Sequence, residues 1–154
     1  MRKSKRDFSP YKSGFEMDVA AFYGKQVEYE PTVIPFVQPE VKRKYLPDFR
    51  IKENVFIETK GKLALEDRKK HLWIKEQHPE ITIIFLFQNS QNKLTRRSNT
   101  TYGDWCDANQ IPWFCWRTNP PPKTIKELLL SISRNLSRQN AEPSTLKASS
   151  RKKK

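Results

Sequence analysis

The stretch that decides the fold is Tyr45–Gly61, YLPDFRIKENVFIETKG. Two segments rich in β-forming residues, 48–51 and 55–60, flank the polar residues 52–54, and this pattern predicts a β-hairpin. With a three-residue loop, Ile51 pairs with Val55. The same register then sets Asp48 opposite Glu58, with Cβ atoms roughly 4.5–5.5 Å apart. A two-residue turn would instead put the two carboxylates on opposite faces of the hairpin.

The predicted hairpin gathers two carboxylates and one amine, because side chains alternate along a strand and Lys60 shares the face of Glu58. Two carboxylates this close cannot both ionise cheaply unless a cation lies between them. Oxygen ligands of this kind suit Mg²⁺. The alternative interpretation is a surface hairpin with an ordinary cross-strand ion pair, and the spacing alone does not decide between the two.

Length and charge narrow the possible classes of protein. A chain of 154 residues suits one domain with appendages, and 30 Lys and Arg against 17 Asp and Glu give a formal net charge of +13. This excess favours an anionic partner, with nucleic acid as the leading candidate. No apolar stretch is long enough to span a membrane, and the basic N-terminus lacks the apolar run of a secretory signal. Cys106 and Cys115 form no CxxC motif, so they are predicted as core residues of a protein in a reducing cytoplasm.

The N-terminal half is predicted to contain one helix and one extended segment before the hairpin. Residues 13–25 have helical spacing, with Ser13 as N-cap, Glu16 as its capping-box partner and Gly24 as the stop. This helix also supplies a third carboxylate in its first turn. Prolines at 31, 35 and 39 interrupt the next segment, so it cannot be an ordinary central strand. We expect a stiff connector or an edge strand there.

The C-terminal half is predicted to alternate helices and strands. Residues 64–80 form a helix whose apolar side is Leu65, Leu72 and Ile74, and residues 81–88 form a strand buried on both faces. A short helix over 100–110, a short strand over 111–116 and a last helix within 119–138 follow. The order of elements predicts an α/β fold with a mixed sheet. Residues 1–12 are predicted as a flexible basic arm and 139–154 as a disordered basic tail.

A helix bearing a glutamate, then Pro47-Asp48, then a strand ending in Glu58-Thr59-Lys60, then another helix, resembles the PD-(D/E)xK nuclease fold. Six segments also resemble, in order, those of the phage endonuclease I family: SGFE, VEYE, PDF, IETKG, EDRKKHLWIKEQHPE and TYGDWC. The resemblance implies a restriction-endonuclease-like mixed sheet flanked by helices, with a nuclease domain over 13–118. It also implies a domain-swapped homodimer, bridged near residues 28–40, that resolves four-way DNA junctions and cuts branched DNA.

The resemblance further implies roles for individual residues. Two Mg²⁺ or Mn²⁺ ions per active site are expected, because such a pair can hold both the attacking and the leaving oxygen. One ion would bind Asp48, Glu58 and the backbone carbonyl of Thr59, and the second would bind Glu16 of the partner subunit together with Asp48. Lys60 is the motif lysine, which would orient or deprotonate water. Glu28 matches a further acidic residue needed for activity.

Basic residues are expected to grip DNA phosphates, which gives affinity without sequence information. No helix suited to base readout is evident, so recognition of DNA shape is expected. Two alternatives stay open: a PD-(D/E)xK nuclease that cuts linear duplex at transposon ends or restriction sites, and a non-enzymatic basic DNA-binding protein. The candidate DNA-binding residues are Lys12, Lys42, Arg43, Lys44, Arg68, Lys69, Lys70, His71, Arg96 and Arg97.

Overall fold

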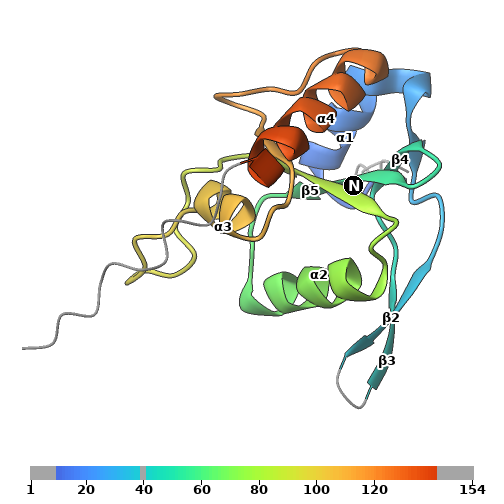
Figure 1. The fold of residues 1–154 in the computed structure, drawn as a ribbon. Helices are drawn as coiled ribbons and strands as arrows, with labels where there is room; N and C mark the ends of the chain where they lie inside the picture. Colours follow the sequence, from blue (N-terminus) through green and yellow to red (C-terminus); the bar gives the residue numbers. More distant parts are fainter. Residues whose placement is uncertain (1–9, 39–40, 142–154) are drawn as a thin grey trace, which may run out of the picture.

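A five-stranded mixed sheet forms the centre of the computed structural model, which describes residues 10–38 and 41–141 (Figure 1). The strand order is β1-β4-β5-β6-β7, in which the β1–β4 and β4–β5 pairs are antiparallel and the β5–β6 and β6–β7 pairs are parallel. The predicted α/β fold with a mixed sheet is therefore confirmed. The strands are β1 (Glu28–Tyr29), β4 (Phe49–Lys52), β5 (Val55–Lys60), β6 (Thr82–Phe87) and β7 (Trp113–Cys115).

The hairpin β4–β5 has the predicted register at its Asp48 end but not at its turn. Phe49 lies opposite Ile57, as predicted, but Lys52, and not Ile51, lies opposite Val55. The turn is the two-residue Glu53-Asn54, and a register shift between Arg50 and Lys52 inserts one extra residue into β4. Such a bulge compensates for the shorter turn. The predicted Ile51–Val55 pair is wrong, yet the register at the Asp48 end of the hairpin is preserved.

Helix α1 (Gly14–Tyr23) begins and ends as the sequence predicts, with Ser13 as N-cap and Gly24 at φ 56° as the stop. The hydroxyl of Ser13 accepts a hydrogen bond from the Glu16 amide over 3.1 Å. The other half of the predicted capping box is wrong. The Glu16 carboxylate accepts hydrogen bonds from the Lys12 amide and the Tyr29 hydroxyl, because β1 lies within its reach. A 3₁₀ turn, η1 (Gly24–Gln26), links α1 to β1.

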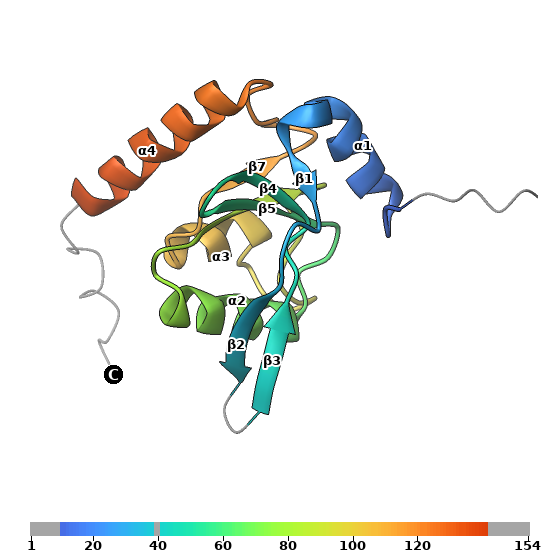
Figure 2. The ribbon, with the colours of Figure 1, turned by 90° about the vertical axis from the view of Figure 1, so that its right-hand side faces the viewer.

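The helices cover the sheet on both faces (Figure 2). On one face, α1 and α4 (Ile125–Ala141) pack through Val19 and Leu128 against apolar side chains that include Ile57 and Leu86. On the other face, α2 (Leu65–Gln77) and α3 (Tyr102–Ala108) pack through Ile74 and Trp105. The strand β6 is buried on both sides, as its continuous apolar run predicts. Over residues 10–38 and 41–141, no helix has the length and apolarity to cross a membrane.

Two predictions about the helices are wrong. Leu65 and Leu72 are 51% and 37% exposed, whereas His71 and Ile74 form the buried face of α2. Apolar residues are so sparse in this helix that their spacing does not reveal which side meets the sheet. Helix α4 continues to Ala141, so residues 139–141 are helical and do not belong to a disordered tail. The remainder of the predicted tail, residues 142–154, lies outside the described residues, as do residues 1–9 of the predicted arm.

The proline-spaced segment forms half of a separate two-stranded ribbon, which the sequence does not predict. Strands β2 (Ile34–Gln38) and β3 (Val41–Tyr45) pair antiparallel, and Ile34 packs with Ile74 of α2. The side-chain amide of Gln77 accepts from the Val37 N–H and donates to the Val37 carbonyl, each over 2.6 Å, so it substitutes for a neighbouring strand. The ribbon extends beyond the sheet below α2 (Figure 2). The proline-spaced segment forms no central strand of the five-stranded sheet, as predicted.

Candidate active site

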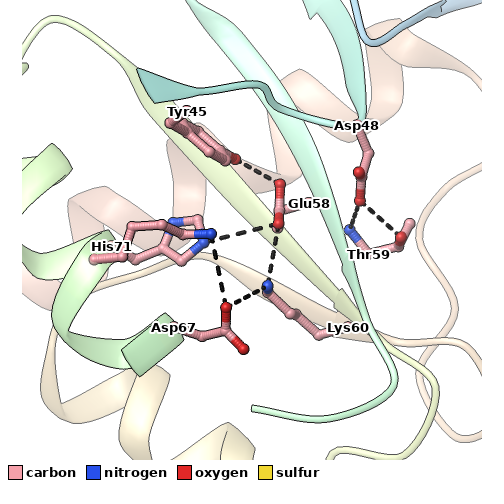
Figure 3. Close-up of polar contacts among 8 residues, drawn as sticks. Tyr45, Asp48, Glu58, Thr59, Lys60, Asp67 and His71 are labelled. Carbon is pink, nitrogen blue, oxygen red and sulfur yellow. Dashed lines mark hydrogen bonds and ion pairs between the residues drawn. The ribbon is translucent and has the colours of Figure 1, made fainter. Parts of the chain in front are cut away.

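Glu58 lies at the centre of a buried polar cluster on the α2 face of the sheet (Figure 3). Its side chain lies on β5 and is only 6% exposed. The Tyr45 hydroxyl donates to Oε2 over 2.6 Å, and the Lys60 ammonium lies 3.1 Å from Oε1. Burial of a carboxylate is costly unless it is paired and hydrogen-bonded, and both conditions are met here.

Asp48 lies just before β4 and is bound to Thr59 on the neighbouring strand. Its Oδ2 accepts hydrogen bonds from the Thr59 amide and hydroxyl, each over 2.8 Å (Figure 3). Burial, followed by the negative charge of Glu58, raises the pKa of Asp48 from 3.8 to about 7, although the Thr59 hydrogen bonds oppose this. The two carboxylates are therefore close enough to repel, as the hairpin register predicts.

Lys60 lies between two carboxylates and is 9% exposed. Its Nζ is 3.1 Å from Glu58 Oε1 and 3.4 Å from Asp67 Oδ1 of α2. Burial lowers the pKa of the ammonium, but the two carboxylates outweigh burial, and the net pKa lies above its ordinary value. Lys60 is therefore a cation at neutral pH in this arrangement, which suits stabilising negative charge and not removing a proton from water.

Glu16 lies near the Asp48 side of the cluster within a single chain. It is buried, and its Oε2 accepts from the Tyr29 hydroxyl over 2.6 Å and from the Lys12 amide over 3.0 Å. Its charge contributes to the raised pKa of Asp48. The supply of Glu16 by a partner subunit stays a prediction, since the structure contains one chain.

Glu28 is not gathered into the cluster. It lies on β1 opposite Arg50, and its 65% exposed side chain ends 3.6 Å from the Arg50 guanidinium. An exposed ion pair of this kind contributes little to stability. The catalytic role of Glu28 stays a prediction, and within one chain its carboxylate pairs with Arg50.

The cluster suits a divalent cation bound by oxygen ligands, although the carboxylate of Glu16 does not join those of Asp48 and Glu58 in one group. Among the residues described, no three His, Cys, Asp or Glu side chains are disposed to hold a metal ion. The carboxylates of Asp48 and Glu58 are the available pair, and burial, followed by the negative charge of Glu58, raises the pKa of Asp48. Mg²⁺ commonly binds through one or two carboxylates and keeps several waters. The donor chemistry therefore fits the predicted metal.

The structure places the predicted DNA-binding residues in three settings. Arg68 and Lys70 are half-buried, and Lys12 is exposed but its ammonium pairs with Glu30. His71 is 2% exposed, so its predicted contact with phosphate is wrong. His71 lies on the buried face of α2, where its ring has almost no exposure to solvent. The exposed members on β3, on α2 and in the loop after β6 are Lys42, Arg43, Lys44, Lys69, Arg96 and Arg97.

His71 instead packs against the buried side of the cluster. Its ring meets Tyr45 and Phe85 edge-on, with centroids 5.1 and 4.6 Å away, and Nε2 lies 3.9 Å from Glu58 Oε1. Burial, followed by the charges of Lys60 and Lys70, holds the pKa of His71 well below its ordinary value. The ring is therefore neutral, and its approach to Glu58 is not an ion pair.

Two residues of the cluster, Tyr45 and Asp67, were missed by sequence reasoning. Tyr45 ends the ribbon strand β3, and no local pattern indicates that it returns to β5. Asp67 has the sequence context of an acid at a helix start. It shares a helix face with His71 and Ile74, at i, i+4 and i+7, but the sparse apolar residues of α2 do not identify that face as the buried one.

The chain resembles known proteins over most of its length. Residues 1–138 match the family model described as Phage endonuclease I. The chain is 44% identical over 104 residues to Endodeoxyribonuclease 1 of Enterobacteria phage T3, an alignment covering 66% of this chain and 68% of that protein. It is 40% identical over 112 residues to Endonuclease I of Escherichia phage T7, covering 71% of this chain and 75% of that protein.

Proposed function

The chain belongs to the phage endonuclease I family, and from this premise we propose that it is a metal-dependent endodeoxyribonuclease that resolves four-way junctions and cuts branched DNA. The observation that carries the proposal is the group formed by the half-buried Asp48 and the buried Glu58 and Lys60 at one end of the β4–β5 hairpin. A protein that only bound DNA would gain nothing from carboxylates there, since they repel phosphate.

The residues of the cluster divide the work of phosphodiester hydrolysis. A bound Mg²⁺ or Mn²⁺ pair would supply an activated water and relieve charge on the attacking and leaving oxygens. Asp48, Glu58 and the Thr59 carbonyl would hold one ion, and Glu16 with Asp48 would hold the second. Lys60, as an ammonium, would hold the scissile phosphate and orient the water.

Selectivity for branched DNA is proposed from the distribution of basic side chains. Lys42, Arg43 and Lys44 are exposed along β3, which extends beyond the sheet as part of the ribbon. Such residues grip phosphates and position DNA without reading bases. A homodimer with shared active sites, bridged by the segment near 28–40, would hold two such sites at a fixed spacing and place paired nicks across a junction. The free thiols of Cys106 and Cys115 fit the reducing cytoplasm of a host cell.

Cleavage of a four-way junction and of a linear duplex built from the same arms tests the proposal. With Mg²⁺, the wild-type protein should cut the junction well above the duplex. Asp48→Ala should lower the single-turnover rate by about 10³-fold or more, while junction binding in Ca²⁺ is retained. Glu53→Ala removes an exposed acid from the turn of the same hairpin and is the matched control. Near-wild-type cutting by Asp48→Ala, or cutting without a divalent ion, contradicts the proposal.

Sharing of active sites has its own experiment. A Glu16→Ala chain mixed with an Asp48→Ala chain should recover junction cleavage if each site takes Glu16 from the partner, because one site of the mixed dimer is then intact. If each site is built within one chain, the mixture stays inactive.

A further inference from the structure

We propose that Asp67 is a positioning residue that holds the Lys60 ammonium in place when a cation occupies Glu58. The inference rests on the role proposed above for Lys60. It assigns to the first turn of α2 a part in the reaction that the sequence pattern does not suggest.

The ammonium of Lys60 is held from two elements at once. Glu58 belongs to the same strand, and its Oε1 lies 3.1 Å from Nζ, whereas Asp67 reaches Nζ from helix α2 at 3.4 Å. The Asp67 carboxylate is itself held, because Lys70 Nζ lies 3.6 Å from the same Oδ1. Lys70 also lies over the Tyr45 ring, 5.2 Å from its centroid. Asp67 is thus a fixed, partly buried negative charge.

The two carboxylates face different demands during the reaction. Glu58 would coordinate a divalent cation, whose positive charge offsets that of the carboxylate. The attraction between Glu58 and Lys60 then weakens. Asp67 is not one of the proposed metal ligands, so it keeps its charge for Lys60 throughout. A lysine side chain is long and rotamer-rich, and it needs a second anchor to stay in one geometry once its first partner is engaged elsewhere.

A neighbouring residue provides a matched control. Glu66 lies beside Asp67 in the first turn of α2, where both carboxylates favour the helix N-terminus. Glu66 is exposed, and within residues 10–38 and 41–141 its side chain forms no hydrogen bond or ion pair. Neutralising either residue removes one negative charge from the same helix turn, but only the change at Asp67 releases Lys60.

The experiment combines Asp67→Asn, Glu66→Gln, Lys60→Ala and the double variant Asp67→Asn/Lys60→Ala in the full chain. Single-turnover cleavage of a four-way junction in Mg²⁺ should fall by about 10- to 100-fold in Asp67→Asn, because loss of positioning costs that much. Junction affinity measured in Ca²⁺ should be unchanged, and Glu66→Gln should cleave within about 2-fold of wild type. In the Lys60→Ala background, Asp67→Asn should cause no further loss. Asp67→Glu should restore part of the rate.

A second readout does not depend on cleavage. In the metal-free protein, the fall in melting temperature caused by Asp67→Asn should shrink in the Lys60→Ala background, because the two residues interact directly. Wild-type cleavage by Asp67→Asn, with cleavage by Lys60→Ala strongly reduced but measurable, overturns this inference and leaves the proposed function intact. An equal loss in Glu66→Gln, or an undiminished loss in the Lys60→Ala background, also overturns it. Wild-type cleavage by Lys60→Ala instead overturns the role proposed for Lys60.

Discussion

The hydroxyl of Tyr45 donates a hydrogen bond to Glu58 Oε2 over 2.6 Å, and both side chains are buried. Tyr45 is the last residue of β3, so this bond joins the ribbon to the centre of the candidate active site. The exposed basic residues of β3 therefore lie on an element that is anchored directly to a proposed metal ligand. If DNA binds the ribbon as proposed, a change in how DNA contacts β3 would reach Glu58 through this hydrogen bond.

Tyr45→Phe should lower the junction cleavage rate with little change in binding. Removing the hydroxyl leaves a buried carboxylate oxygen without its donor, which costs about 1–3 kcal/mol. Tyr23→Phe is the control, because Tyr23 is also buried and loses a hydrogen bond, to the Pro122 carbonyl, on the far side of the sheet. Equal cleavage by the two variants would contradict a role for the Tyr45–Glu58 bond.

Asp48→Asn should stabilise the metal-free protein at pH 8. Folding raises the pKa of Asp48 from 3.8 to about 7, so the folded state binds more protons than the unfolded state between these values. Stability from this group is present below about pH 4 and is lost as the pH rises to 7. The loss is on the order of 2–4 kcal/mol, given that the side chain is only partly buried. Thermal unfolding from pH 4 to 8 measures it.

The same measurement with a divalent cation tests the metal site. Ca²⁺ should raise the melting temperature of the wild-type protein at pH 8, since ligand binding to the folded state stabilises it. The rise should be absent in Asp48→Asn. Asp18→Asn, at an exposed position of α1, should leave both the pH profile and the Ca²⁺ response unchanged. The pH prediction fails if metal-free Asp48→Asn melts at a lower temperature than the wild-type protein at pH 8, because the Asp48 charge then carries no penalty for folding.

Replacement of Lys42, Arg43 and Lys44 by glutamine should weaken junction binding and flatten its dependence on salt. Each lost phosphate contact lowers the slope of log K against log salt by about 0.9. The rate of cleavage at saturating protein should be retained. The control changes Lys25, Lys123 and Lys126, three exposed lysines near the contact between η1 and the start of α4. Equal weakening by both triple variants would assign the affinity to net charge and not to the ribbon.

Gln77→Ala should loosen the ribbon without unfolding the sheet. The Gln77 amide satisfies both backbone groups of Val37, so its removal leaves that edge of β2 to solvent. Hydrogen exchange should become faster over residues 34–38. Glu76→Ala is the control, at a neighbouring exposed position of α2. Unchanged exchange in Gln77→Ala would show that the ribbon is held without the Gln77 bonds, by the packing of Ile34 and Phe36 and by its other hydrogen bonds to the sheet and to the C-cap of α2.

Local sequence pattern by itself determines much of this protein. The apolar run of β6, the N-cap of α1 and the alternation that puts Glu58 and Lys60 on one face all depend on neighbours a few residues apart, and all appear as predicted. The predicted register at the Asp48 end of the hairpin is correct although the predicted turn is not, because a bulge at Ile51 compensates for a shorter turn.

The side chains that surround Glu58 and Lys60 come from other elements, and only the tertiary structure brings them together. Tyr45 reaches Glu58 from the ribbon, and Asp67 reaches Lys60 from α2. His71 turns inward, whereas Lys69 in the same basic run is exposed. These contacts depend on which side of α2 meets the sheet and on where the ribbon folds back. Charged residues surround the few apolar positions of α2, so its own periodicity cannot set that orientation. Burial against β5 and β6 sets it.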